Sequence, residues 1–233
     1  MSWIEHDHAS LDALAAHVAG ELEHACADAI KARGIAWIAL AGGRTPLPIY
    51  ARLARSANVP GISAIPTDER CVPHDHPACN LTALRAAFAA HQGVVVNRLT
   101  REDGNIDASL AQSRGMLALN PQPFDAVLLG MGADGHFASL FPGAANLAEG
   151  LAMDAGVDTI ATLPDPRPPE APFARISLTL PRLLRSRQLH LVVSGDDKRQ
   201  VLRRAQRQDA GHGFPVAALL HARDHRVQIH WSP

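Results

Sequence analysis

The chain is poor in the residues that mark secreted, nucleic-acid-binding or membrane-spanning proteins. It has three cysteines in 233 residues and no Cys-x-x-Cys pair, which argues against a disulfide framework and indicates a reducing compartment. Its 22 basic and 23 acidic residues nearly cancel, so we expect no nucleic-acid partner. The longest wholly apolar stretch, residues 35–41, is strand-sized and too short to cross a membrane.

Several signatures of localisation and chemistry are also absent. Residues 1–8 lack the basic and apolar regions of a signal peptide, so we expect a cytoplasmic protein with no membrane partner. No G-x-S-x-G nucleophile elbow is present, which disfavours a serine hydrolase. His74-Asp75-His76 invites a metal interpretation, but no further ligand follows at zinc-like spacing. We therefore expect a surface loop there, no metal and no cofactor.

What the chain does have is a regular alternation of apolar strands and amphipathic helices. Helices are expected over 10–33 (capped by Ser10 and Gly34), from Pro46 to about 57, over 80–91 and 107–119, and from Asp196 or Asp197 onward; strands are expected over 35–41, 62–65, 124–129, 189–193 and 227–231. The Pro-rich segment 164–172 must be a loop. This order predicts one α/β domain over 1–233, a three-layer α/β/α sandwich with a mostly parallel, modified Rossmann-like sheet.

Three polar or glycine-rich segments each follow a predicted strand. They are residues 42–46, the polar loop 67–70, and the turn 130–136. Ligands of parallel sheets bind where strands end and the chain turns toward a helix. We therefore expect these segments, distant in sequence, to converge on one rim of the sheet.

The first of these segments, Gly42-Gly43-Arg44-Thr45-Pro46, resembles a phosphate cradle. Two glycines allow the backbone to approach an anion, and Thr45 adds a hydroxyl donor. A plain strand-to-helix turn would also use Gly-Gly, so both interpretations stay open. The spacing is not that of a P-loop.

The turn Gly130-Met131-Gly132-Ala133-Asp134-Gly135 has the G-x-G-x-x-G spacing of a dinucleotide site. However, Pro142-Gly143 stops any following helix after about two turns, which leaves no long helix for a pyrophosphate. The more informative pair is Asp134 and His136. A partly exposed imidazole can act as a general base near neutral pH, and a nearby carboxylate can orient it. The alternative is that Asp134 only closes the turn and His136 is incidental.

Other charged residues could serve the same site. Asp68 and Arg70 could contact a sugar phosphate, although a solvated charged turn is the alternative, and Arg175 and Lys198 could reach an anion or remain solvated. Cys71 beside Arg70 could be a reactive thiolate, but a buried, inert thiol is the better interpretation.

Together these segments resemble the 6-phosphogluconolactonase family. The matching stretches are 40–46, 68–73 with Asn80 downstream, 129–143, 175–177 and 195–198, in the family's order and across nearly the whole chain. The resemblance implies an α/β sandwich shared with glucosamine-6-phosphate deaminases, and hydrolysis of a phosphorylated sugar lactone in the oxidative pentose phosphate pathway without a cofactor. It implies that His136 is the catalytic base, assisted by Asp134, and that Gly43, Thr45, Arg70, Arg175 and Lys198 lie around the sugar phosphate. Taking this together with the residues themselves, we predict a catalytic group of His136, Asp134 and Arg70, and a substrate-binding group of Gly42, Gly43, Arg44, Thr45, Asp68, Arg175 and Lys198.

The sequence departs from the family at four positions, namely Thr67, Phe137, Ser177 and Ser232, which bear on substrate preference. The related deaminases place a glutamate where this chain has Phe141, so their ring-opening chemistry would lose a participant here. A deaminase or isomerase and a non-catalytic sugar-phosphate sensor are the two alternatives. A monomer or a small homo-oligomer is expected.

Overall fold

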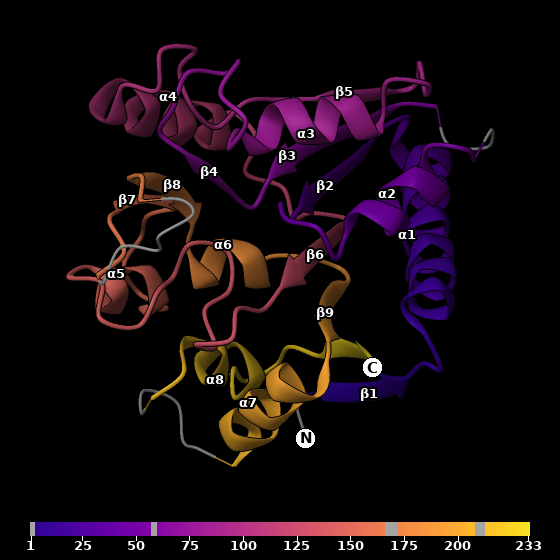
Figure 1. Ribbon diagram of the computed structural model, residues 1–233. Coiled ribbons are helices and arrows are strands. Elements are labelled where there is room, and N and C mark those ends of the chain that lie inside the picture. The colour runs from indigo at the N-terminus through magenta and orange to yellow at the C-terminus, as the bar shows by residue number, and fades with distance from the viewer. Residues whose placement is uncertain (1–2, 57–59, 166–171, 208–212) are drawn as a thin grey trace.

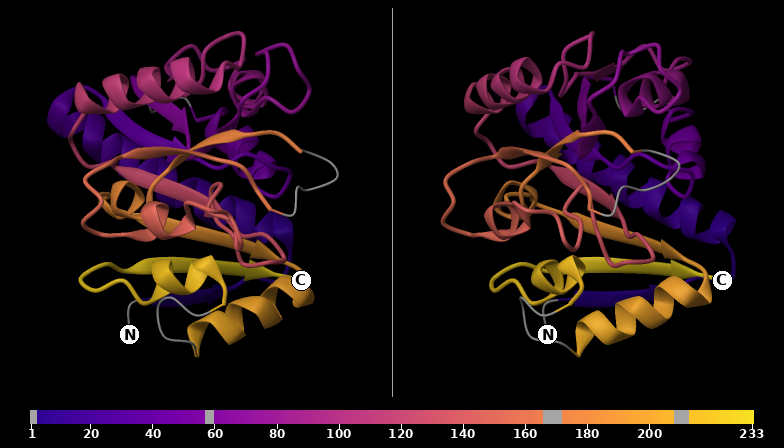
Figure 2. Two further views of the ribbon diagram at one scale, coloured as in Figure 1. Left: turned by 90° about the vertical axis from the view of Figure 1, so that its left-hand side faces the viewer. Right: turned by 60° about the vertical axis from the view of Figure 1, so that its left-hand side comes forward.

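A seven-stranded parallel sheet forms the centre of the computed structural model, which describes residues 3–56, 60–165, 172–207 and 213–233. Its strand order is β1-β10-β9-β6-β2-β3-β5, and every neighbouring pair runs parallel. The strands are β1 (Trp3–Asp7), β2 (Ala36–Leu40), β3 (Ile62–Pro66), β5 (Val94–Val96), β6 (Ala126–Gly130), β9 (Leu189–Ser194) and β10 (Val227–Ser232). Figure 2 shows β1 and β10 side by side although they come from opposite ends of the chain.

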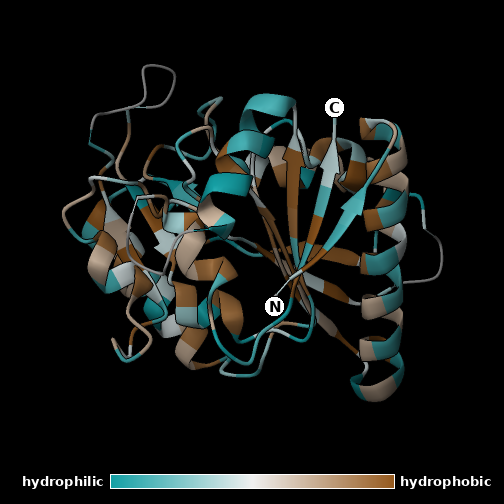
Figure 3. Ribbon diagram, turned by 90° about the horizontal axis from the view of Figure 1, so that it is seen from below, coloured by the Kyte–Doolittle hydropathy of each residue, from teal (hydrophilic) through white to brown (hydrophobic). Residues whose placement is uncertain are grey.

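Helices cover both faces of this sheet, as the alternation of elements predicted. They are α1 (Leu11–Arg33), α2 (Leu47–Leu53), α3 (Asn80–Ala87), α4 (Ile106–Ala118), α5 (Leu147–Leu151), α6 (Leu180–Leu184), α7 (Asp196–Gln206) and α8 (Pro215–Leu220). In β2, Trp37 belongs to a core cluster that includes buried residues of α4 and α6 to α8, while Ile38 belongs to a second cluster with buried residues of α1 to α3. The sheet is therefore buried on both faces, and Figure 3 shows its mostly apolar strands beside α1, whose surface carries both apolar and polar residues. The three-layer prediction is confirmed.

A second, three-stranded antiparallel sheet was not predicted. It consists of β4 (Asp68–Arg70), β8 (Arg175–Leu178) and β7 (Thr159–Thr162), in that order. The prediction of a polar loop over 67–70 was therefore wrong. Asp68 and Glu69 are 6% and 0% exposed, because both carboxylates find hydrogen-bond donors inside the protein.

Helix ends agree with the sequence where a cap was recognised and differ elsewhere. Ser10 accepts a hydrogen bond from the Ala13 amide at the start of α1, and Gly34 ends that helix in a left-handed conformation, as expected. Other predicted boundaries were wrong: α2 ends at Leu53 rather than near 57, α3 ends at Ala87 and has Cys79 at its N-cap, and α4 begins after Asn105.

Two further observations concern loops. The segment directly after His136 is not helical, and a turn with an isolated bridge between Phe137 and Leu140 leads to α5. Of the expected Pro-rich loop, residues 166–171 lie outside the described residues. In the described part of the chain, no helix combines the length and apolar character that a membrane span requires.

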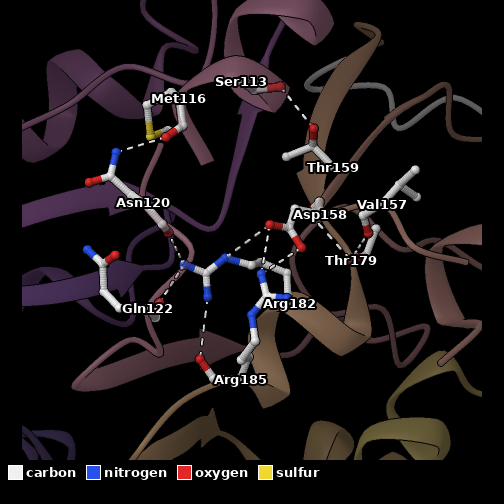
Figure 4. Close-up of polar contacts among 10 residues, drawn as sticks. All are labelled: Ser113, Met116, Asn120, Gln122, Val157, Asp158, Thr159, Thr179, Arg182 and Arg185. Atoms are coloured by element: carbon white, nitrogen blue, oxygen red, sulfur yellow. Dashed lines mark hydrogen bonds and ion pairs between the residues drawn. The ribbon is translucent and has the colours of Figure 1, made fainter. Parts of the chain in front are cut away.

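A buried arginine joins α6 to the segments around it (Figure 4). The Arg182 side chain is 0% exposed and lies over the Phe124 ring, 3.7 Å from its centroid. It donates to the carbonyls of Gln122 at 3.2 Å and of Asn120 and Arg185 at 3.4 Å, and its Nε lies 3.7 Å from an Asp158 carboxylate oxygen. These contacts tie the segment before β7 and the loop after α4 to the same helix.

Candidate active site

The three segments expected to converge do meet, at a cleft of about 250 Å³ beside the carboxyl ends of β2 and β6. This volume is close to the lower end of the range of small-molecule sites, about 300–1,000 Å³. Nine of the ten residues expected at the site line this cleft: Gly42, Gly43, Arg44, Thr45, Asp68, Arg70, His136, Arg175 and Lys198. The tenth, Asp134, does not line the cleft but is hydrogen-bonded to His136, which does.

His136 and Asp134 form a hydrogen-bonded pair at the mouth of the turn after β6. Nδ1 of His136 lies 2.5 Å from Oδ1 of Asp134, and the His136 side chain is 28% exposed. Partial burial raises the pKa of Asp134, but the hydrogen bonds and charge of His136 outweigh this, so the net pKa is lowered. An ionised Asp134 accepts a hydrogen bond from the Nδ1–H group of His136. The lone pair on Nε2 of the neutral imidazole is then available as a base.

The backbone of the turn leaves room for this imidazole. The Gly132 amide donates to the His136 carbonyl at 2.9 Å, which folds the ring back over Gly132. A Cβ atom at position 132 would lie 2.2 Å from the imidazole and 2.6 Å from the Asp134 carboxylate. Only glycine fits there, so the close approach explains the second glycine of the motif.

Phe141 supports the imidazole from its face. The two ring centroids lie 4.1 Å apart with a 31° tilt, and Phe141 is 5% exposed. The Arg175 guanidinium lies over the same phenyl ring, 4.8 Å from its centroid. One buried aromatic ring therefore contacts both the candidate base and a candidate anion-binding arginine.

The Asp68 carboxylate contacts Ser139, to which the sequence assigned no role, and Ser139 in turn contacts Ser177, one of the four departures from the family. Oδ2 of Asp68 accepts from the Ser139 hydroxyl at 2.5 Å, and the Ser139 amide donates to the Ser177 hydroxyl at 3.1 Å. Ser177 pairs with Asp68 across β4 and β8. Only the position of Ser139 within the motif that carries His136 could have pointed to this network.

Asn80 is a further lining residue that sequence reasoning treated as a helix cap. Its amide group donates to the Asp68 carbonyl at 2.8 Å, and the side chain is 3% exposed. A Cβ atom at position 42 would lie 2.1 Å from Oδ1 of Asn80. The close contact with Gly42 joins the Gly-Gly loop to the start of α3.

Lys198 lies in the first turn of α7, as expected, and faces the same cleft. Burial lowers the pKa of its ammonium group, while the nearby Asp134 carboxylate opposes that shift. Burial also lowers the pKa of Arg175, which is 4% exposed, and the Asp68 carboxylate offsets part of this. The cleft therefore concentrates positive charge in a partly desolvated space.

The residues considered for metal binding or thiol chemistry have other contacts. His74 bonds to the Thr100 hydroxyl, and His76 accepts from the Ala78 amide. Among the residues that the structure describes, no group of three or more histidine, cysteine or carboxylate side chains is arranged to hold a metal ion. Burial raises the pKa of the Cys71 thiol to about 11, which keeps it protonated and unreactive.

Comparisons with known proteins agree over nearly the whole chain. A family model described as glucosamine-6-phosphate isomerases/6-phosphogluconolactonase matches residues 9–231. The 6-phosphogluconolactonase of Pseudomonas putida is 32% identical over 231 residues, which cover 98% of this chain and 92% of the relative. That of Mesorhizobium japonicum is 34% identical over 227 residues, covering 94% of this chain and 91% of the relative.

Solved structures of the same family are also similar to this chain over nearly its whole length. The crystal structure of a 6-phosphogluconolactonase from Shewanella baltica has a TM-score of 0.90 at 30% identity and covers 99% of this chain and 97% of its own. A monomeric glucosamine-6-phosphate deaminase has a TM-score of 0.76 at 21% identity, which is a similarity of fold.

Proposed function

The chain belongs to the family of glucosamine-6-phosphate isomerases and 6-phosphogluconolactonases, and we propose that it hydrolyses 6-phospho-D-glucono-1,5-lactone to 6-phosphogluconate. The observation that carries the proposal is the hydrogen bond between Asp134 and His136 beside a cleft lined by four cationic side chains, Arg44, Arg70, Arg175 and Lys198. An oriented imidazole suits the activation of water, and the cations suit a phosphorylated substrate.

In the proposed reaction His136 acts as a general base. Its Nε2 takes a proton from a water molecule while the water oxygen bonds to the lactone carbonyl carbon. When the tetrahedral intermediate collapses, the bond from this carbon to the ring oxygen breaks, and the imidazolium returns the proton to that oxygen. Asp134 stabilises the transient imidazolium through Nδ1. General base catalysis of this kind contributes about 10²–10⁴-fold.

The remaining cleft residues divide between the oxyanion and the phosphate. Arg70 or an amide of the turn 132–135 stabilises the negative oxygen of the intermediate, a contribution whose loss typically costs about 10²–10³-fold. The loop 42–45, Arg175 and Lys198 hold the phosphate. This division predicts that the first group sets turnover and the second sets affinity.

A deaminase or isomerase reaction is less well supported by the side chains at the imidazole. Phe141 contacts the His136 ring where ring-opening chemistry would require a carboxylate. Lactone hydrolysis needs a base for one water and an oxyanion donor, and both fit the cleft. Release of ammonia from glucosamine 6-phosphate by the protein would support the deaminase reaction instead.

The experiment is to measure proton release from freshly generated 6-phosphogluconolactone against the uncatalysed background. The His136→Ala variant should lose at least about 10²-fold in kcat while binding 6-phosphogluconate nearly as well as the wild type. His24→Ala, which removes an exposed histidine of α1, is the matched control. Wild-type turnover in His136→Ala would exclude the proposed base.

A further inference from the structure

Glu69 is a buried carboxylate that the proposed reaction does not use. Alternation along β4 turns its side chain away from the cleft that Asp68 and Arg70 line, toward the start of α3. The residue is 0% exposed. An uncompensated carboxylate in such a place would cost several kcal/mol, so its partners decide what it does.

Those partners are the first backbone amides of α3. Oε1 of Glu69 accepts from the Asn80 amide at 2.7 Å and from its neighbour Arg70 at 2.9 Å, while Oε2 accepts from the Leu81 amide at 2.6 Å. The Cys79 thiol lies 3.7 Å from Oε2. The first amides of a helix have no acceptor within the helix. One carboxylate on β4 therefore accepts hydrogen bonds from two such amides of α3 and links the two elements.

The two elements joined in this way each supply a side chain to the cleft. Arg70 follows Glu69 directly, and Asn80 is the residue whose amide Glu69 holds. The Arg70 guanidinium in turn donates to the Ala78 carbonyl at 2.6 Å, two residues before α3. A change in the contact between β4 and α3 would therefore move both side chains relative to His136.

We propose that Glu69 is a positioning residue for lactone hydrolysis: its carboxylate fixes α3 against β4 and so sets the places of Arg70 and Asn80. This inference rests on the proposed function for its reaction, but the contacts that carry it lie outside the cleft. A displacement of about 1 Å of an oriented group can cost 10²-fold in rate.

The charge environment makes this contact dependent on pH. Burial raises the pKa of Glu69 to about 7, although the amides of Asn80, Leu81 and Arg70 oppose the shift, and the Asp68 carboxylate adds to it. The other titratable or charged groups that face Glu69 are the thiols of Cys71 and Cys79 and the Arg175 guanidinium on β8. Protonation would turn one carboxylate oxygen into a hydroxyl group, which is a weaker acceptor for a backbone amide.

The sharpest test is a double-mutant cycle with Glu69→Gln, Arg70→Ala and the double variant. In Glu69→Gln an amide group replaces one carboxylate oxygen and faces an N–H donor, so we expect kcat/KM to fall about 10- to 100-fold. If Glu69 acts through Arg70 as well as Asn80, the loss of kcat/KM in the double variant should be smaller than the product of the two single losses. Losses that multiply, or wild-type kcat/KM in Glu69→Gln, would overturn the proposal. Glu149→Gln, an exposed site on α5, is the control.

A second readout is the acid side of the pH profile. Protonation of Glu69 in the wild type should lower kcat/KM about 10- to 100-fold as the pH falls through about 7, as the neutral Glu69→Gln side chain does. In Glu69→Gln this decrease should be absent, because the amide does not titrate. The same decrease in Glu69→Gln would contradict the proposal.

Failure of the proposed function would be recognised separately. If the wild type does not hydrolyse the lactone, the same cycle is measured on the Kd of 6-phosphogluconate, which needs no turnover. If Glu69→Gln does not fold, hydrogen-exchange protection of the Asn80 and Leu81 amides is measured in the wild type. Both amides should be protected above about pH 7, where the carboxylate is ionised, and less protected below it, and unprotected amides above pH 7 would refute the role of the carboxylate.

Discussion

Arg70 and Arg175 lie directly opposite each other in the antiparallel pair of β4 and β8, and both line the cleft. Like charges at opposed positions of a sheet destabilise it. The negative charge of the Asp68 carboxylate attracts the Arg175 guanidinium and offsets part of this repulsion. An anion bound in the cleft would relieve the rest, so this pair is the strongest structural argument for a phosphorylated substrate.

The first prediction concerns this charge pair. Arg175→Ala should raise KM for the phosphorylated lactone about 10- to 100-fold, because a charge-assisted contact contributes about 1.5–3 kcal/mol. The preference over the unphosphorylated lactone should fall by a similar factor. Steady-state kinetics on both lactones give the answer, with Arg55→Ala, an exposed arginine, as control. A preference that survives in Arg175→Ala would mean that the phosphate binds elsewhere.

The second prediction concerns the ring beneath the base. Phe141→Leu should lower kcat about 3- to 10-fold, because an aromatic pair contributes about 0.5–1.5 kcal/mol to holding His136. Phe141→Tyr keeps the ring and should stay close to the wild type. Turnover at saturating lactone is the measurement, made below the unfolding transition of each variant. Equal kcat in the two variants would show that the stacking has no part in catalysis.

The third prediction concerns stability away from the cleft. Arg182→Ala should lower the free energy of unfolding by about 3–5 kcal/mol, because it leaves buried carbonyls without donors and removes the contact with Phe124. Urea unfolding of this variant and of Arg55→Ala provides the comparison. A loss below about 1 kcal/mol would show that water replaces the guanidinium at little cost.

The fourth prediction concerns acid. His190 and His230 are 0% and 1% exposed and lie in a chain of imidazoles, with His8 3.3 Å from His230 and His230 3.2 Å from His190. Burial, with smaller contributions from neighbouring histidines, lowers the pKa of His190 to about 4 and that of His230 to about 2. Both are neutral in the folded protein at pH values where an unfolded histidine, with a pKa of about 6.5, is charged.

The unfolded chain therefore binds more protons, so stability is complete above about pH 6.5 and is lost as the pH falls toward 4. At pH 5 each of the two histidines should lower the free energy of unfolding by about 2 kcal/mol relative to pH 7. Glu69, whose pKa is raised to about 7, binds a proton on folding below that pH and offsets about 2 kcal/mol of this loss. Urea unfolding at the two pH values should therefore show a net loss of about 2 kcal/mol. A free energy of unfolding that is equal at the two pH values, or higher at pH 5, would contradict neutral burial of these rings.

Local patterns were enough to predict the elements that carry their own signals. The capped helix α1 and the apolar strand β2 followed from Ser10, Gly34 and a continuous run of apolar residues. The short edge strands β1 and β5 were missed because the few residues in each carry no clear periodicity. The ends of α2 and α3 were placed too late, since the apolar pattern continues beyond the last helical hydrogen bonds.

The sequence by itself determined the α/β order of the elements and the spacing of Asp134 and His136, because each depends on residues close together in the chain. It also predicted that three distant segments converge on one rim, because parallel strands all end at the same edge of a sheet. Only the tertiary structure decided that 68–70 is a buried strand, that Arg70 opposes Arg175, and that Glu69 holds α3. Those relationships join segments about ten to a hundred residues apart, and a local pattern of charged residues cannot distinguish a solvated turn from a strand whose charges find partners inside the fold.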